Sequence, residues 1–186
     1  MMSKFSFKSG NLFPKMPKIV RRFKKDEDGV TAIEFSILAL PFFTLVFAII
    51  ETSVFFLAGQ YLEASVDNVA RKVRTGQLDN TLTEAQFRQE VCNEAAIMFD
   101  CSGLKLDMQV AATFDDLDDP PTPDADGNYD DSGYSFTAPG PIQIVQITAT
   151  YEWPVITNLA APLSTNAAGR WALLHVISVL RTEPYS

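Results

Sequence analysis

The sequence predicts an α+β fold, in which one long apolar N-terminal helix leads into a domain with a second helix and a small antiparallel sheet. Three observations support this. The chain is predominantly apolar from Val30 to Ala58, later segments repeat apolar residues at helical spacing, and three others are rich in β-branched and aromatic residues. With 186 residues, 47% of them hydrophobic, the chain has the length of one or two domains and is too apolar for a disordered acidic chain.

The apolar run predicts a transmembrane helix over residues 30–58. Its centre, Phe35–Ile50, carries no charged residue. At about 1.5 Å per residue the run forms a helix of roughly 43 Å, whereas the apolar core of a bilayer is about 30 Å thick. The alternative is a buried core helix, which is disfavoured because globular helices seldom stay apolar on every face for this length.

Charge is distributed unevenly on the two sides of this run. Residues 1–28 hold eight Lys or Arg against three acids, and the rest of the chain carries a net charge of −13. The positive-inside rule then predicts a cytoplasmic N-terminus and an exported C-terminal domain. This segregation favours a membrane protein over a nucleic-acid-binding one, so no nucleic-acid partner is expected. A cleaved secretory signal fits poorly, because the run exceeds a typical apolar region and no Ala-x-Ala site follows Leu57.

The start of the run has an unusual pattern, Gly29-Val-Thr-Ala-Ile-Glu34-Phe35. A glutamate one turn into a span is costly unless it stays hydrated at the headgroup level, which is one interpretation of Glu34. The pattern also resembles the class III leader of type IV pilin-like proteins, which is cut on the cytoplasmic side after the glycine. That resemblance implies a new amino group on Val30, close to the Glu34 carboxylate, and pairing of the glutamate of one subunit with the terminal amine of its neighbour.

Among pilin-like proteins, the chain resembles the TadE family of Tad/Flp pilus assembly proteins. The resemblance covers nearly everything from Arg21 onward and depends on several segments in one order: Gly29–Pro41, Glu51-Thr52, Gly59-Gln60, Arg71–Gln77 (RKVRTGQ), Cys92 and Cys101, Tyr151–Pro154, and Arg181–Tyr185.

The resemblance implies a minor pilin or pseudopilin needed to assemble or secrete Tad/Flp pili. Its expected partners are the inner membrane, a prepilin peptidase, other Tad pilins and minor pilins, and the Tad assembly platform. Residues 1–29 would be a cytoplasmic leader, 30–58 the transmembrane helix and 59–186 a periplasmic pilin-like domain. The alternative is a permanently anchored periplasmic scaffold or binding module that never enters a pilus.

Site roles follow the same resemblance. Gly29 and Val30 would form the processing site, and Glu34 with Phe35 would set the registry between subunits. Pro41 is expected to kink the helix.

Two helices are predicted around the start of the exported domain. The first continues out of the membrane to about Arg74, where Thr75-Gly76 ends it, on an apolar stripe of Leu62, Val66, Val69 and Val73. The second begins after Thr83 as N-cap and has Phe87, Val91, Ala95 and Met98 on one face. Both stripes are interpreted as packing surfaces.

Three strands are predicted in the rest of the domain. Leu104–Val110 alternates apolar and polar residues, which indicates a half-buried strand. Ile142–Trp153 is rich in β-branched and aromatic residues and ends at Pro154. Trp171–Leu180 is expected to be an inner strand covered on both faces, with His175 in the core.

Cys92 and Cys101, nine positions apart, are expected to form a disulfide if the domain is periplasmic; two buried free thiols are the alternative. A zinc site is not expected, because two thiols and one distant histidine supply too few ligands.

Eight aspartates lie between Asp115 and Asp131. Their positions do not match the ligand positions of an EF-hand calcium loop. We therefore expect a solvated loop that turns at Asp126-Gly127, with an irregular calcium site as the alternative. No catalytic signature is present, and we expect neither enzymatic activity nor a cofactor.

Overall fold

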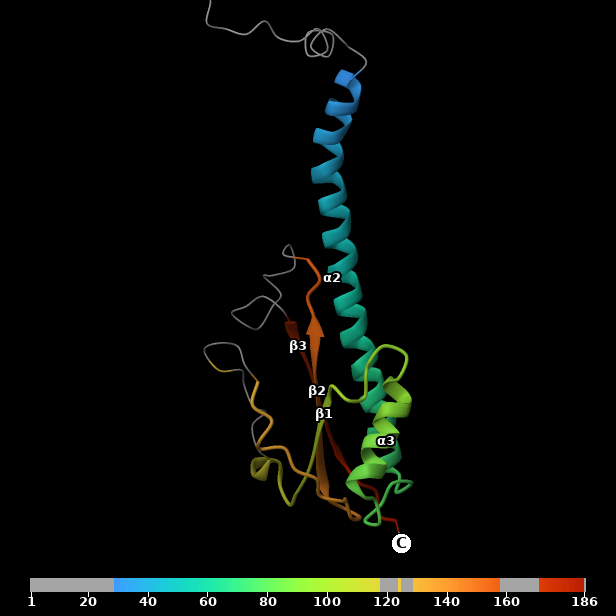
Figure 1. Ribbon diagram of the computed structural model, residues 1–186. Helices are drawn as coiled ribbons and strands as arrows, with labels where there is room; N and C mark the ends of the chain where they lie inside the picture. The colour runs from blue at the N-terminus through green and yellow to red at the C-terminus, as the bar shows by residue number, and fades with distance from the viewer. Residues whose placement is uncertain (1–28, 118–123, 125–128, 158–170, 186) are drawn as a thin grey trace, which may run out of the picture. The chain divides into compact units, whose positions relative to one another are not determined.

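The computed structural model describes residues 29–117, 124, 129–157 and 171–185. Its elements follow the chain in this order: helix α2 (Val30–Arg74), helix α3 (Glu84–Ala95), strand β1 (Leu104–Ala111), the 3-10 turn η2 (Phe114–Asp116), strand β2 (Ile144–Pro154) and strand β3 (Trp171–Arg181) (Figure 1). The predicted α+β fold is therefore confirmed. The basic leader, residues 1–28, and the expected turn at Asp126-Gly127 lie outside the described residues.

Helix α2 ends where the sequence predicts. Arg74 is its last residue, and Gly76 has a φ of 74°, the left-handed conformation that ends many helices. The N–H groups of Gln77 and Leu78 both donate to the Lys72 carbonyl, at 2.9 and 3.3 Å. These bonds satisfy a carbonyl that the last turn of the helix would otherwise leave without a partner.

Helix α3 begins with the predicted Thr83 cap. The Thr83 N–H donates to Gln86 Oε1 at 2.9 Å, and the Gln86 N–H donates back to Thr83 Oγ1 at 3.3 Å, which completes a capping box. The face that carries Phe87, Val91 and Ala95 is buried. Met98 lies beyond the helix, in the turn that follows it.

The three strands form one antiparallel sheet in the order β1-β2-β3. Leu104 pairs with Tyr151 at one end of the β1–β2 ladder, and Pro154 pairs with Trp171 at one end of the β2–β3 ladder. Strand β2 begins after Ile142, whose positive φ of 62° places it in a turn and not in the predicted strand.

The prediction that residues 171–180 form an inner strand is wrong. Among the described residues β3 has a sheet neighbour on one side only, and β2 is the central strand. Ala172 and Leu174 face the core, whereas Ile177 is 40% exposed on the opposite face. His175 lies on that opposite face and is exposed, so its predicted place in the core is also wrong. A continuous apolar run thus does not require burial on both faces, because the outer face of this strand stays partly exposed.

The core lies between the C-terminal half of α2, helix α3 and one face of the sheet. Each element contributes fully buried apolar side chains: Leu62, Val66, Val69 and Val73 from α2, Phe87 and Val91 from α3, and Leu104, Met108, Val145 and Ile147 from the sheet. Both predicted helical stripes are therefore packing surfaces. Burial of this kind is the main favourable term in folding.

Strand β1 departs from the simple alternation that the sequence predicts. Asp107 is only 2% exposed, although it is one of the polar residues that alternate with the apolar ones along this strand. Its carboxylate accepts the Ser135 N–H at 2.7 Å, and the Met108 N–H donates to the Ser135 carbonyl at 3.0 Å. The segment around Ser135 thus covers the outer edge of β1, and Asp107 is buried because it binds this segment.

Candidate functional site

The N-terminal part of α2 carries the predicted processing and registry residues on an exposed surface. Gly29 precedes the helix, Val30 is its first residue and is 49% exposed, and Phe35 is 67% exposed. Glu34 is also exposed. Among the described residues, a Cβ atom added at Gly29 would meet nothing within 4 Å. Packing within this part of the chain therefore gives no reason for a glycine at position 29.

Pro41 lies inside the continuous helix. Because proline has no N–H, the carbonyl of Ile37 lacks its usual helical partner, which is the local condition for a kink. The apolar side chains around Pro41 face outward: Leu38, Leu40, Phe42 and Leu45 are 70%, 71%, 60% and 61% exposed. Such a surface needs an apolar environment, either lipid or other helices.

Glu51 has a specific role that the sequence did not predict. Its Oε1 atom accepts the N–H groups of Ile156 at 2.6 Å and Thr157 at 3.0 Å, and its other oxygen contacts the Thr157 hydroxyl. The Glu51 carboxylate on α2 therefore accepts hydrogen bonds from two backbone N–H groups that lie beyond the end of β2. The sequence predicts no role for Glu51 beyond its place in the family resemblance, because no pattern within one sequence links it to residues more than a hundred positions away.

Lys72 of the RKVRTGQ segment joins α2 to α3. Lys72 Nζ contacts Glu90 Oε2 at 2.8 Å and Glu94 Oε1 at 3.1 Å, both on α3. The hydrogen bond to Glu90, followed by that to Glu94, raises the pKa of Lys72 above its ordinary value. The Tyr61 hydroxyl adds a bond to the Glu94 carbonyl at 2.8 Å. These contacts fix α3 against the last turns of α2.

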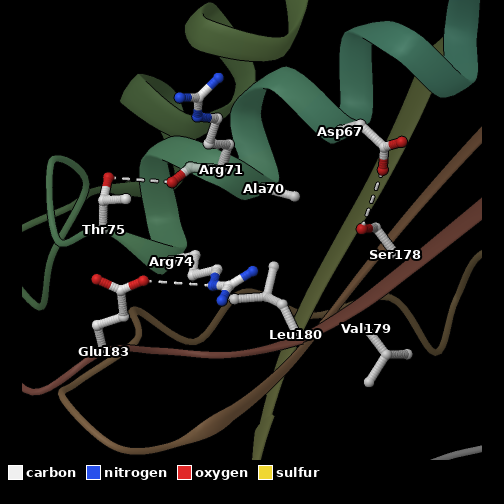
Figure 2. Close-up of a pocket in the computed structure, with 9 residues that line it drawn as sticks. All are labelled: Asp67, Ala70, Arg71, Arg74, Thr75, Ser178, Val179, Leu180 and Glu183. Atoms are coloured by element: carbon white, nitrogen blue, oxygen red, sulfur yellow. Dashed lines mark hydrogen bonds and ion pairs between the residues drawn. The ribbon is translucent and has the colours of Figure 1, made fainter.

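A groove of about 550 Å³ lies between the last turns of α2 and strand β3, and Figure 2 shows the residues that line it. Two contacts cross it: Ser178 Oγ donates to Asp67 Oδ1 at 3.3 Å, and Arg74 Nε lies 3.5 Å from Glu183 Oε1. The Glu183 N–H also donates to the Arg74 carbonyl at 2.9 Å. The polar groups of the groove therefore join α2 to the C-terminal segment of the chain.

Cys92 and Cys101 lie at disulfide distance, with 5.6 Å between their Cα atoms. Cys92 is on the buried face of α3, and Cys101 precedes β1. The geometry therefore allows the predicted bond, which would close the turn between α3 and the sheet.

Within the described ranges, no group of three or more His, Cys, Asp or Glu side chains could hold a metal ion. Asp118, Asp119 and Asp126 of the aspartate-rich loop lie outside those ranges. The loop's described end is held by contact between the Tyr129 and Tyr134 hydroxyls, and burial raises the pKa of Tyr134.

The fold and the exposed helix together define a class of protein. Helix α2 is long and apolar enough to cross a membrane, and its most apolar 18-residue window is 0% buried. One apolar helix of this kind, followed by an α+β unit, fits a single-pass membrane anchor.

A narrower likeness comes from comparison with known families. Residues 29–71 match the model of the family described as TadE-like protein. The resemblance inferred from the sequence is confirmed for this segment, which begins at Gly29 and ends in the RKVRTGQ segment. No curated protein and no solved structure gave a significant match to the chain.

Proposed function

We propose that this chain is a TadE-like minor pilin or pseudopilin of a Tad/Flp pilus system. It crosses the inner membrane once with residues 1–28 in the cytoplasm, and its α+β unit lies in the periplasm. The observation that supports the proposal best is that the TadE-like match begins at Gly29 and continues through the exposed apolar part of α2. A prepilin peptidase cuts after Gly29, and the helix then packs with other Tad pilins or with the assembly platform.

Glu34 has the central chemical role in this proposal. Its exposed carboxylate pairs with the amino group of Val30 on a neighbouring subunit, which lowers the cost of holding both charges among apolar helices. Among the described residues the same chain offers Glu34 no ion-pair partner.

The test compares pilus output in a deletion strain that expresses either wild-type protein, Glu34→Ala or Glu63→Ala. Glu63 is an exposed glutamate on the same helix, beyond the apolar run, and serves as the matched control. We expect Glu34→Ala to insert normally but to impair pilus output, while Glu63→Ala behaves as wild type. Equal pilus output from all three would contradict the registry role of Glu34 and favour a permanently anchored scaffold.

A further inference from the structure

Glu51, Ile156 and Thr157 form one corner of the α+β unit, called here the Glu51 corner. It combines a carboxylate that accepts three hydrogen bonds with an exposed apolar side chain. The backbone of Ile156 is held against α2 by a 2.6 Å bond to Glu51, while its side chain is 84% exposed. We propose that the Glu51 corner lies in the lipid interface of the bilayer that holds α2, with Ile156 inserted at the apolar boundary. This inference relies on the proposed membrane anchoring.

The length of the apolar helix places the bilayer boundary at this corner. From Val30 to Ile50 the helix measures about 31 Å, close to the roughly 30 Å of a bilayer core. Ile49 and Ile50 are 57% and 51% exposed, and one face of the helix stays exposed as far as Leu57, at 60%, whereas Ala58 is fully buried by protein. A helix that enters the apolar core of the bilayer at Val30 therefore leaves it near Ile50, one residue before Glu51.

The chemistry of the corner suits an interface. A carboxylate at the edge of the apolar core is costly when it is unpaired, and Glu51 receives two backbone N–H groups and one hydroxyl. The chain's two tryptophans, Trp153 and Trp171, both lie at the same end of the sheet, since Trp171 pairs with Pro154. Tryptophan is enriched at membrane interfaces. The exposed Ile156, two residues after the end of β2, adds apolar area that lipid can cover.

The test places an environment-sensitive fluorophore (NBD) on the full chain in phosphatidylcholine vesicles, at Ile156→Cys, Ile142→Cys or Leu45→Cys. Labelling without reductant leaves paired Cys92 and Cys101 unmodified. Ile142 is the matched control, because it is 56% exposed and precedes β2, whereas Ile156 follows the other end of that strand. Quenching is measured with nitroxide lipids that carry the spin label either near the headgroup or deep in the acyl chains.

We expect the label at position 156 to be quenched several-fold more strongly by the shallow nitroxide than the label at 142, and the label at 45 to be quenched by the deep nitroxide. Labels at 156 and 142 that respond alike, while 45 is quenched, would overturn the interface proposal and leave the anchor intact. A label at 45 that neither nitroxide quenches would instead contradict the membrane anchor itself.

Discussion

The ring of Tyr185 lies directly against Gly76, so that a Cβ atom at position 76 would come within 2.5 Å of two ring carbons. Gly76 also has a φ of 74°, which disfavours any residue with a side chain. The Tyr185 hydroxyl donates to the Pro139 carbonyl at 3.3 Å, which fixes the ring in place. The turn that ends α2 and the C-terminal segment are thus fitted to each other.

Replacing Gly76 should therefore destabilise the fold. We expect Gly76→Ala to lower the free energy of unfolding by about 1 kcal/mol from backbone strain alone, and further because the Tyr185 ring must move. Urea unfolding of the detergent-solubilised chain measures the change. Gly133→Ala is the control, since a Cβ atom there meets nothing within 4 Å. Equal stability of the two variants would show that the Gly76–Tyr185 contact is unimportant.

The ion pairs of Lys72 predict a pH dependence. Because Glu90 and Glu94 raise the pKa of Lys72 in the folded protein, their contribution is complete below the pKa of an unfolded lysine, about 10.4, and is lost as the pH rises through the folded value. Thermal unfolding of wild type should lose stability above about pH 10 more steeply than Lys72→Arg, whose guanidinium keeps its charge. Parallel pH profiles would contradict this role of Lys72.

The cysteine pair predicts a dependence on redox state. If the domain is periplasmic and the pair is oxidised, closing the loop between Cys92 and Cys101 stabilises the fold by about 2–3 kcal/mol. The double variant Cys92→Ser/Cys101→Ser should lose that amount in urea unfolding without reductant, and wild type in reductant should match it. Alkylation of both thiols in protein taken from native membranes without reductant would show that they are free.

Gly29→Ala should separate processing from folding. None of the residues that the structure describes would contact the added methyl group, so helix content and membrane insertion are expected to equal those of wild type. Leader removal should be abolished, because in the proposed function the peptidase recognises the glycine at the cleavage site. Immunoblotting resolves the full-length and shortened forms, and normal shortening of the variant would rule out the assigned cleavage site.

The sequence predicts the helices well because their signals are local. The Thr83 cap, the stop after Arg74 and the buried helical stripes depend on residues within a few positions of one another. The strands are predicted at nearly their observed bounds for the same reason. The order of the strands in the sheet is not predicted correctly. A continuous apolar run such as residues 171–180 fits either an inner strand or an edge strand that packs against the core with one face.

The contacts that complete the candidate sites are long-range and could not be predicted. Glu51 binds residues 156 and 157, Asp107 binds Ser135, and Gly76 meets Tyr185. Each of these polar or small residues has an ordinary local role in the sequence, as a surface charge or a turn. Only the fold shows that they join separate segments.

The N-terminal residue of the protein purified from native membranes tests the proposed function most directly. Intact mass and terminal sequencing should show a chain that begins at Val30, with the Gly29 leader removed, as expected of a prepilin-type subunit. A chain that still begins at Met1 or Met2, in cells that express the peptidase, would contradict processing and support a permanently anchored scaffold.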